Sequence, residues 1–82
     1  MIKVLYFARL AEELGCRNEE IQADNINQVS DLMALLQQRG EPFSSALANS
    51  SVLVSINQEM AKAEDAVSDG DEVAFFPPVT GG

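Results

Sequence analysis

The chain of 82 residues has no histidine and no tryptophan, and Cys16 is its only cysteine. Without histidine, acid–base chemistry near neutral pH lacks its usual side chain. One cysteine cannot assemble the clusters that hold zinc, so no metal site is expected. A lone cysteine also excludes an internal disulfide, which favours a reducing, cytoplasmic setting. We interpret Cys16 as an ordinary thiol.

Basic residues are scarce as well. Five Lys and Arg stand against thirteen Asp and Glu, which gives a formal net charge of −8. Nucleic-acid binding and attachment to anionic membranes both depend on basic side chains, so neither kind of partner is expected. A protein with a basic face would instead be steered toward this chain.

Long apolar runs and glycine-rich loops are also absent from the sequence. No run approaches the roughly 20 residues of a transmembrane helix, and the N-terminus lacks the layout of a signal peptide. The glycines are scattered or terminal, so no loop is suited to cradle a phosphate. The segment Asp69-Gly70-Asp71 is too short for a calcium loop. We therefore expect neither an enzyme that acts alone nor a cofactor bound by the isolated chain.

What the chain does contain is an alternating pattern typical of strands, in a composition that is 46% hydrophobic and 22% charged. The predicted strands are residues 2–8, 19–23 and 51–56, a short segment around Met60, and residues 72–76. Turns are predicted at Asn57-Gln58 and Asp69-Gly70. Residues 9–14 predict a short helical turn that ends at Gly15. We expect a short turn at 43–47 and a loop at 49–51.

One segment has the periodicity of a longer helix. Its apolar stripe comprises Val29, Leu32, Met33, Leu35 and Leu36. Asn27 is the candidate N-cap, with Asp31 near the positive end of the helix dipole. Gly40 can cap the other end, and Pro42 prevents continuation. A stripe of this kind is typical of a core.

The order of these elements predicts an α+β fold of the ubiquitin-like β-grasp type, with a mixed sheet of four to five strands packed on one main helix. We expect the domain to span residues 1–76 and a tail to span residues 77–82. With the first and last strands adjacent, the residues facing the helix are Ile2, Val4, Tyr6, Val73 and Phe75. Phe7 and Phe76 are then left on the opposite face, either as a partner surface or covered by loops.

The chain ends in Phe75-Phe76-Pro77-Pro78-Val79-Thr80-Gly81-Gly82. The prolines favour extended backbone, and the glycines allow a close approach to another surface. Six extended residues reach roughly 20 Å, enough to enter the active site of a second protein. We interpret the terminal carboxylate as the working group; the alternative is a frayed end with no role.

A carboxylate becomes reactive when its oxygen attacks the α-phosphate of ATP, because AMP is then a good leaving group. A sulfur donor can displace AMP and leave a thiocarboxylate, which divides one hard step into two easier ones. A partner must supply the nucleotide site and the charge stabilisation. Gly82 supplies the carbonyl carbon, and Gly81 keeps the entry channel free of side-chain clashes.

The chain resembles the small, sulfur-carrier subunit of molybdopterin synthase along its whole length. The residues that carry the resemblance are the closing segment from Asp69 to Gly82, the opening Ile2-Lys3-Val4-Leu5-Tyr6-Phe7-Ala8, and Asn57-Gln58 before a short apolar segment. Residues 40–51 add little. Tyr6 departs from the family pattern, which more often has phenylalanine there.

This resemblance implies that an ATP-dependent enzyme adenylates Gly82, which then becomes a thiocarboxylate. It implies that Pro77, Pro78, Val79, Thr80, Gly81 and Gly82 enter the large, catalytic subunit. There the sulfur passes to cyclic pyranopterin monophosphate within a heterotetramer of two small and two large subunits. The apolar surface that meets both partners is matched by Phe7, Met60 and Phe76.

Three other functions remain open at this level. A sulfur carrier for thiamine synthesis shares the diglycine and its activation, although the approach Phe-Phe-Pro-Pro-Val-Thr favours the molybdenum pathway. A ubiquitin-like modifier would join Gly82 to lysines of target proteins through an isopeptide bond. An inert module would be unaffected by loss of Gly82.

Overall fold

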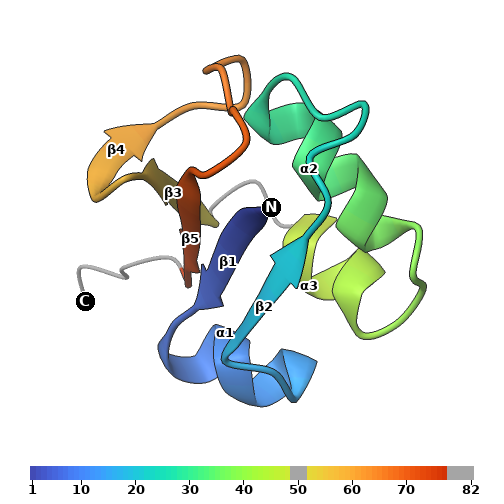
Figure 1. Cartoon of the computed structure of the whole chain (residues 1–82). Coiled ribbons are helices and arrows are strands. Elements are labelled where there is room, and N and C mark those ends of the chain that lie inside the picture. The colour runs from blue at the N-terminus through green and yellow to red at the C-terminus, as the bar shows by residue number, and fades with distance from the viewer. Residues whose placement is uncertain (49–51, 78–82) are drawn as a thin grey trace.

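The computed structural model describes residues 1–48 and 52–77. It contains a mixed sheet of five strands in the order β2-β1-β5-β3-β4 (Figure 1). The strands are β1 (Ile2–Tyr6), β2 (Asn18–Ile21), β3 (Leu53–Ile56), β4 (Glu59–Ala61) and β5 (Glu72–Phe76). The predicted last strand is confirmed residue for residue, and the first two end two residues earlier than predicted.

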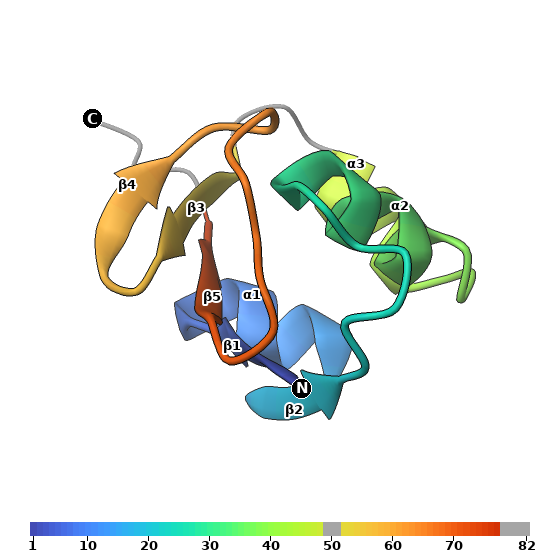
Figure 2. The same cartoon turned by 45° about the horizontal axis from the view of Figure 1, so that its top comes forward.

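Three helices accompany the sheet: α1 (Ala8–Leu14), α2 (Val29–Gln37) and α3 (Phe43–Ala48). Figure 2 shows α2 and α3 lying together on one side of the sheet, with α1 at its end. The turn predicted at 43–47 is therefore a helix, and the predicted loop at 49–51 lies outside the described residues. Among residues 1–48 and 52–77, no helix lies across the other face of the sheet.

The first and last strands form the centre of the sheet, as predicted. β1 pairs in parallel with β5, with Val4 opposite Val73 and Tyr6 opposite Phe75. β5 is also paired on its other side, antiparallel to β3. Because both edges of β5 are hydrogen-bonded, the strand that carries the chain to its C-terminus is held firmly in the sheet.

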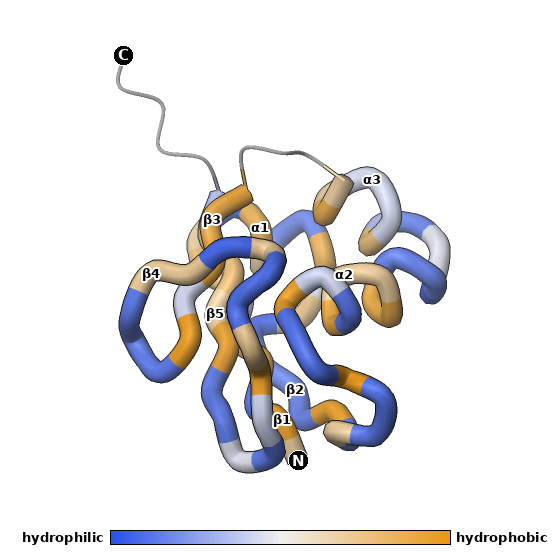
Figure 3. The backbone as a smooth tube through the Cα atoms, turned by 90° about the horizontal axis from the view of Figure 1, so that it is seen from above, coloured by the Kyte–Doolittle hydropathy of each residue, from blue (hydrophilic) through white to orange (hydrophobic). Residues whose placement is uncertain are grey.

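The core lies between the sheet and the helices. The residues predicted to face the helix are all buried: Ile2, Val4, Tyr6, Val73 and Phe75. Val29, Leu32 and Leu36 meet them from α2 with no exposed surface. Leu35 is 40% exposed, so its assignment to the stripe was wrong. Figure 3 shows the resulting division, with hydrophobic residues along the central strands and hydrophilic residues in many of the connecting loops.

The start of α2 also differs from the prediction. The N-cap is Gln28 and not Asn27, and Asp31 accepts hydrogen bonds from the backbone N–H groups of both residues. Asp31 thus closes the reciprocal pairing of a capping box near the positive end of the helix dipole. The hydrogen bonds of Asp31, the third residue of the helix, place the N-cap at Gln28, one position after the predicted Asn27.

The predicted turns are confirmed by their backbone angles. Asn57 and Gln58 both have positive φ, as a two-residue hairpin between β3 and β4 requires. Gly15 ends α1 in the left-handed conformation, and Gly70 has φ +94° before β5. Asn57 also binds across to β5, since its side chain accepts a hydrogen bond from the Glu72 N–H.

Candidate functional site

The end of β5 positions the start of the C-terminal segment. Phe75 is fully buried, whereas Phe76 and Pro77 are only half-buried on leaving the strand. The carbonyl of Phe75 accepts a hydrogen bond from the Phe7 N–H at 3.1 Å, which ties this exit to the end of β1. Pro78, Val79, Thr80, Gly81 and Gly82 lie outside the described residues, and their predicted role stays a prediction.

The two aromatic side chains at this exit form a stack. The rings of Phe7 and Phe76 have centroids 4.9 Å apart and planes 9° from parallel. Phe7 is 42% exposed, so one ring of the pair remains accessible. Strand alternation explains the arrangement, because Phe76 points to the face opposite Phe75. A rigid apolar surface therefore lies where the chain leaves the sheet.

This surface continues over the helix-free face. Leu53 lies opposite Phe76 in the register of β3 and β5 and is 37% exposed. Met60 lies on β4 opposite Ser55 and is 65% exposed. We call Phe7, Leu53, Met60 and Phe76 the apolar patch. Exposed groups of this kind mark partner surfaces more often than chance exposure does.

The structure thus places the three predicted interface residues, Phe7, Met60 and Phe76, on one face and brings two of them into contact. Leu53 was not among the predicted residues. Its signal was present in the sequence, because Val52, Val54 and Ile56 alternate along the predicted strand and so share one face. Strict alternation then places Leu53 on the other side.

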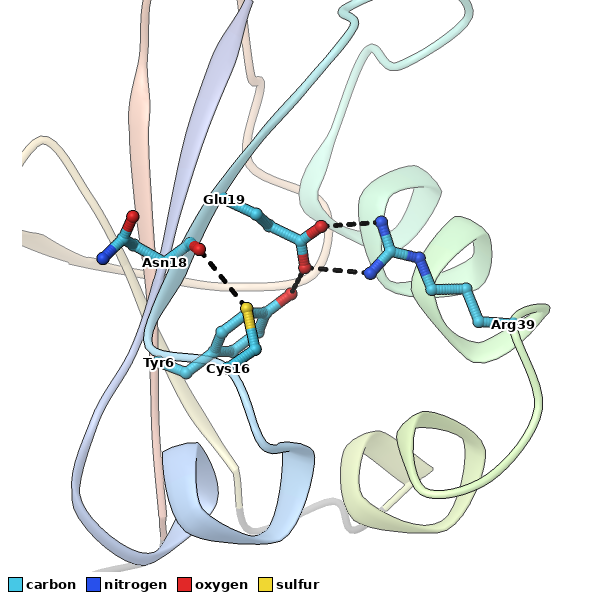
Figure 4. A network of polar contacts seen from close by, with 5 residues as sticks. All are labelled: Tyr6, Cys16, Asn18, Glu19 and Arg39. Carbon is cyan, nitrogen blue, oxygen red and sulfur yellow. Dashed lines mark hydrogen bonds and ion pairs between the residues drawn. The ribbon is translucent and has the colours of Figure 1, made fainter.

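A polar network fixes the opposite, helix-facing side of the sheet (Figure 4). The Tyr6 hydroxyl donates to Glu19 Oε2 at 2.8 Å. The guanidinium of Arg39 donates to both oxygens of Glu19, at 2.8 and 2.9 Å, and lies 4.9 Å from the centroid of the Phe43 ring. The network joins β1 and β2 to the connection between α2 and α3. It gives the hydroxyl of Tyr6 a defined partner.

The network shifts the ionisation of two of its members. Burial, and then the hydrogen bond to Glu19, raises the pKa of Tyr6 above its ordinary value. Partial burial acts to raise the pKa of Glu19. The hydrogen bonds from Arg39 and Tyr6 outweigh that effect and hold this pKa below its ordinary value. The carboxylate of Glu19 is therefore the form that stabilises the fold.

This depressed pKa predicts a stability difference that depends on pH. Glu19→Gln should lower the free energy of unfolding at neutral pH by on the order of 1 kcal/mol, because the side chain remains partly solvated. In the unfolded chain the carboxyl group of Glu19 is protonated near pH 4.3. The difference in unfolding free energy between the unaltered chain and Glu19→Gln should therefore be present above about pH 5 and shrink as the pH falls further. Urea unfolding across this range measures it.

Glu20→Gln is the matched control, since Glu20 is exposed on the neighbouring position of β2. It should leave the unfolding curve unchanged across the same range. A Glu19→Gln deficit of constant size from neutral to acid pH would contradict the assignment of a depressed pKa.

The sulfur of Cys16 lies near this network and donates to the carbonyl of Asn18 at 3.3 Å. Within residues 1–48 and 52–77, no group of His, Cys, Asp and Glu side chains could hold a metal ion. The same two segments contain no helix long and apolar enough to span a membrane.

Comparison with known proteins identifies the family. The sequence model of the ThiS family matches residues 4–82 of this chain. The chain is 40% identical to the molybdopterin synthase sulfur carrier subunits of Haemophilus influenzae and Escherichia coli, over 100% of each chain. The chain belongs to the ThiS family. This membership covers the β-grasp body and the closing residues together.

Solved structures similar to this family member agree on the fold. SAMP1 from Haloferax volcanii is 31% identical, with a TM-score of 0.76 over 99% of this chain and 98% of that one. A chain in the complex of subunits 1 and 2 of molybdopterin-converting factor from Helicobacter pylori is 26% identical. Its TM-score is 0.68 over 99% of this chain and 97% of that one. The predicted ubiquitin-like β-grasp fold is confirmed.

Proposed function

We propose that this chain is the sulfur carrier of a molybdopterin synthase, with Gly82 as the group that carries the sulfur. The observation that carries the proposal is that the match to sulfur carrier subunits extends to the end of this chain. The chain matches named sulfur carrier subunits over its full length, so the match extends to the final residue, Gly82. The central strand β5 leads directly to the segment that ends in Gly82.

The proposed chemistry has three steps. The Gly82 carboxylate attacks the α-phosphate of ATP and releases pyrophosphate, which leaves an acyl-adenylate. A sulfur donor then displaces AMP and forms the thiocarboxylate. In the synthase the sulfur passes to cyclic pyranopterin monophosphate, and water returns Gly82 to a carboxylate. The nucleotide site and the charged groups for each step belong to the partners.

Two protein partners follow from this scheme: the large subunit of the synthase and an ATP-dependent adenylating enzyme. The solved Helicobacter pylori complex, which joins two subunits of molybdopterin-converting factor, supports the first partner. We propose that Phe7, Met60 and Phe76 form the contact, within a cytoplasmic heterotetramer of two small and two large subunits. The chain acts there as a non-catalytic subunit that delivers sulfur.

The interface role of Phe7 can be tested with a matched pair of variants. Phe7→Glu should weaken binding to the large subunit at least tenfold, because it places a charge in a desolvated apolar contact. Leu35→Glu makes the same charge change at a residue of similar exposure, 40% against 42%, on α2. Calorimetric titration should show little effect of the α2 variant, and thermal unfolding should show that both variants remain folded.

A different result would relocate the contact. If Leu35→Glu weakened binding as much as Phe7→Glu, the helix-free face would lose its assignment as the contact. A large fall in melting temperature for Phe7→Glu alone would instead place that ring in the core.

A second function has a specific observation in its favour. SAMP1 from Haloferax volcanii is similar to this chain in fold and sequence. A second solved structure from this organism names the protein small archaeal modifier protein 1. A modifier would end in an isopeptide bond between Gly82 and lysines of target proteins. A sulfur carrier for thiamine synthesis would use the same activated diglycine terminus, so it too needs a direct test.

Reconstitution separates these functions. The chain, the activating enzyme, ATP and a sulfur donor are combined with either the large synthase subunit and cyclic pyranopterin monophosphate, or a thiazole synthase and its precursor. We expect the dithiolene product in the first mixture only. Thiazole formation alone would assign the chain to thiamine synthesis. Ladders of lysine conjugates in cells, without any thiocarboxylate, would assign it to protein modification.

A further inference from the structure

An open depression lies beside the aromatic pair. It is formed where β1 ends, by α1 and by the residues that lead into β2. Its apolar floor includes Leu5 and Phe7, and its charged lining consists of Arg9, Glu12 and Arg17. The lining therefore has a net positive charge in a chain whose total is −8. The depression adjoins the apolar patch, because Phe7 belongs to both.

Both arginines are available to a partner. Arg9 and Arg17 are exposed, and within residues 1–48 and 52–77 the ion pairs join other groups, the N-terminus with Asp69 and Arg39 with Glu19. Arg17 is held in place through its backbone, since its carbonyl accepts a hydrogen bond from the Tyr6 N–H at 2.8 Å. Arg9 lies two residues beyond Phe7, in the first turn of α1.

The other end of the same face has the opposite sign. In the register of the sheet, Lys3 lies between Glu20 on β2 and Glu72 on β5. Two carboxylates thus flank one amine there. Charge therefore changes from net positive in the depression beside the ends of β1 and β5 to net negative near the starts of these strands, with the apolar patch beside the positive end.

We propose that Arg9 and Arg17 bind carboxylates on the large synthase subunit and so fix its orientation on the apolar patch. The inference rests on the proposed function. Apolar burial gives affinity without direction, so the patch alone permits rotation of the partner. Charge complementarity supplies direction, and a guanidinium pairs with a carboxylate in a defined, two-pronged geometry. A short tail reaches a buried site only from one orientation.

The test is a comparison of charge reversals at different places on the chain. Arg9→Glu and Arg17→Glu should each raise the Kd for the purified large subunit roughly tenfold at low salt, and the loss should shrink at high salt. Lys62→Glu changes the net charge equally but follows β4, at the edge of the sheet opposite β2 and the depression. It should change the Kd by less than about twofold.

The outcomes distinguish this inference from the proposed function. If the unaltered chain does not bind the large subunit, the proposed function fails. If it binds and the arginine variants match Lys62→Glu, the orientation proposal fails while the function stands. Arg9→Gln and Arg17→Gln repeat the comparison without an added negative charge, and melting temperatures confirm that each variant is folded.

A second measurement locates the partner carboxylates. Arg17→Lys introduces an amine that a carbodiimide can couple to a carboxylate in direct contact. Mass spectrometry of the cross-linked complex should identify one acidic segment of the large subunit. Coupling spread over unrelated segments, or none at all in a complex that forms normally, would overturn the proposed pairing.

Discussion

Deletion of Gly82 is expected to abolish sulfur transfer completely and to leave the melting temperature unchanged. The reason is that the reacting carbonyl carbon belongs to this residue, whereas the last strand ends at Phe76. The truncated chain ends in Gly81 and still has a carboxylate, but one residue too short to reach the reacting position. Formation of dithiolene in the reconstituted synthase measures the activity, and thermal unfolding measures the fold.

The matched control adds one alanine after Gly82. This variant keeps every native residue but has no free carboxylate on Gly82, so it should be equally inactive and equally stable. Full activity of either variant would show that the terminal glycine is not the carrier. Unfolding of the truncated chain would show that Gly82 serves the fold instead.

The second large effect is expected on the stability of the fold, when the buried Phe75 is replaced. Its neighbour Phe76 lies on the opposite face of β5 and provides the comparison. Phe75 has no exposed surface and stacks on Tyr6, with ring centroids 6.0 Å apart. Phe75→Ala should cost about 3 to 5 kcal/mol of unfolding free energy. A domain of 82 residues has only roughly 4 to 12 kcal/mol in total, so this variant should lose a large share of its stability and melt at a clearly lower temperature.

Phe76→Ala should behave differently, although it removes the same ring one position away. The loss of its stack on Phe7 and of partial burial should cost only about 1 to 2 kcal/mol. Binding to the large subunit should nevertheless fall at least tenfold, because buried aromatic anchors dominate interfaces. Urea unfolding and calorimetric titration of both variants provide the comparison. Equal destabilisation by the two substitutions would contradict the division between core face and partner face.

Much of the fold could be predicted from the sequence because local patterns and tertiary packing agree. Residues 73–76 are a short apolar run that follows a strong turn at Asp69-Gly70, and the strand lies where it was predicted. The turn at Asn57-Gln58 is equally local. Asn57 is of a residue type that tolerates the positive φ that a tight hairpin needs.

The errors have physical causes that lie outside local pattern. Leu35 fits an apolar stripe, but the width of the buried face is decided by the sheet it meets, and only Val29, Leu32 and Leu36 are buried on α2. The cap at Gln28 depends on the reach of the Asp31 side chain. The helix at 43–48 is short, and short helices are stabilised mainly by packing that a local pattern does not report.

The candidate site divides in the same way. Phe7 and Phe76 could be assigned to one face by alternation, but their stacking and the neighbouring Leu53 required the pairing register. The charged flank was not predictable, since Arg9 and Arg17 are brought to one depression by the packing of α1 against the sheet end. From the sequence alone only the net charge of the chain could be stated, and not where on the surface the arginines lie.

The central claim is that Gly82 leaves its activating enzyme as a thiocarboxylate. Intact mass spectrometry of the chain, after incubation with that enzyme, ATP and a sulfur donor, tests it most directly. We expect a mass increase equal to the exchange of one oxygen for one sulfur, located to Gly82 by fragmentation and absent without ATP. A chain that keeps its original mass under these conditions, while the enzyme consumes ATP with another carrier, would contradict the account.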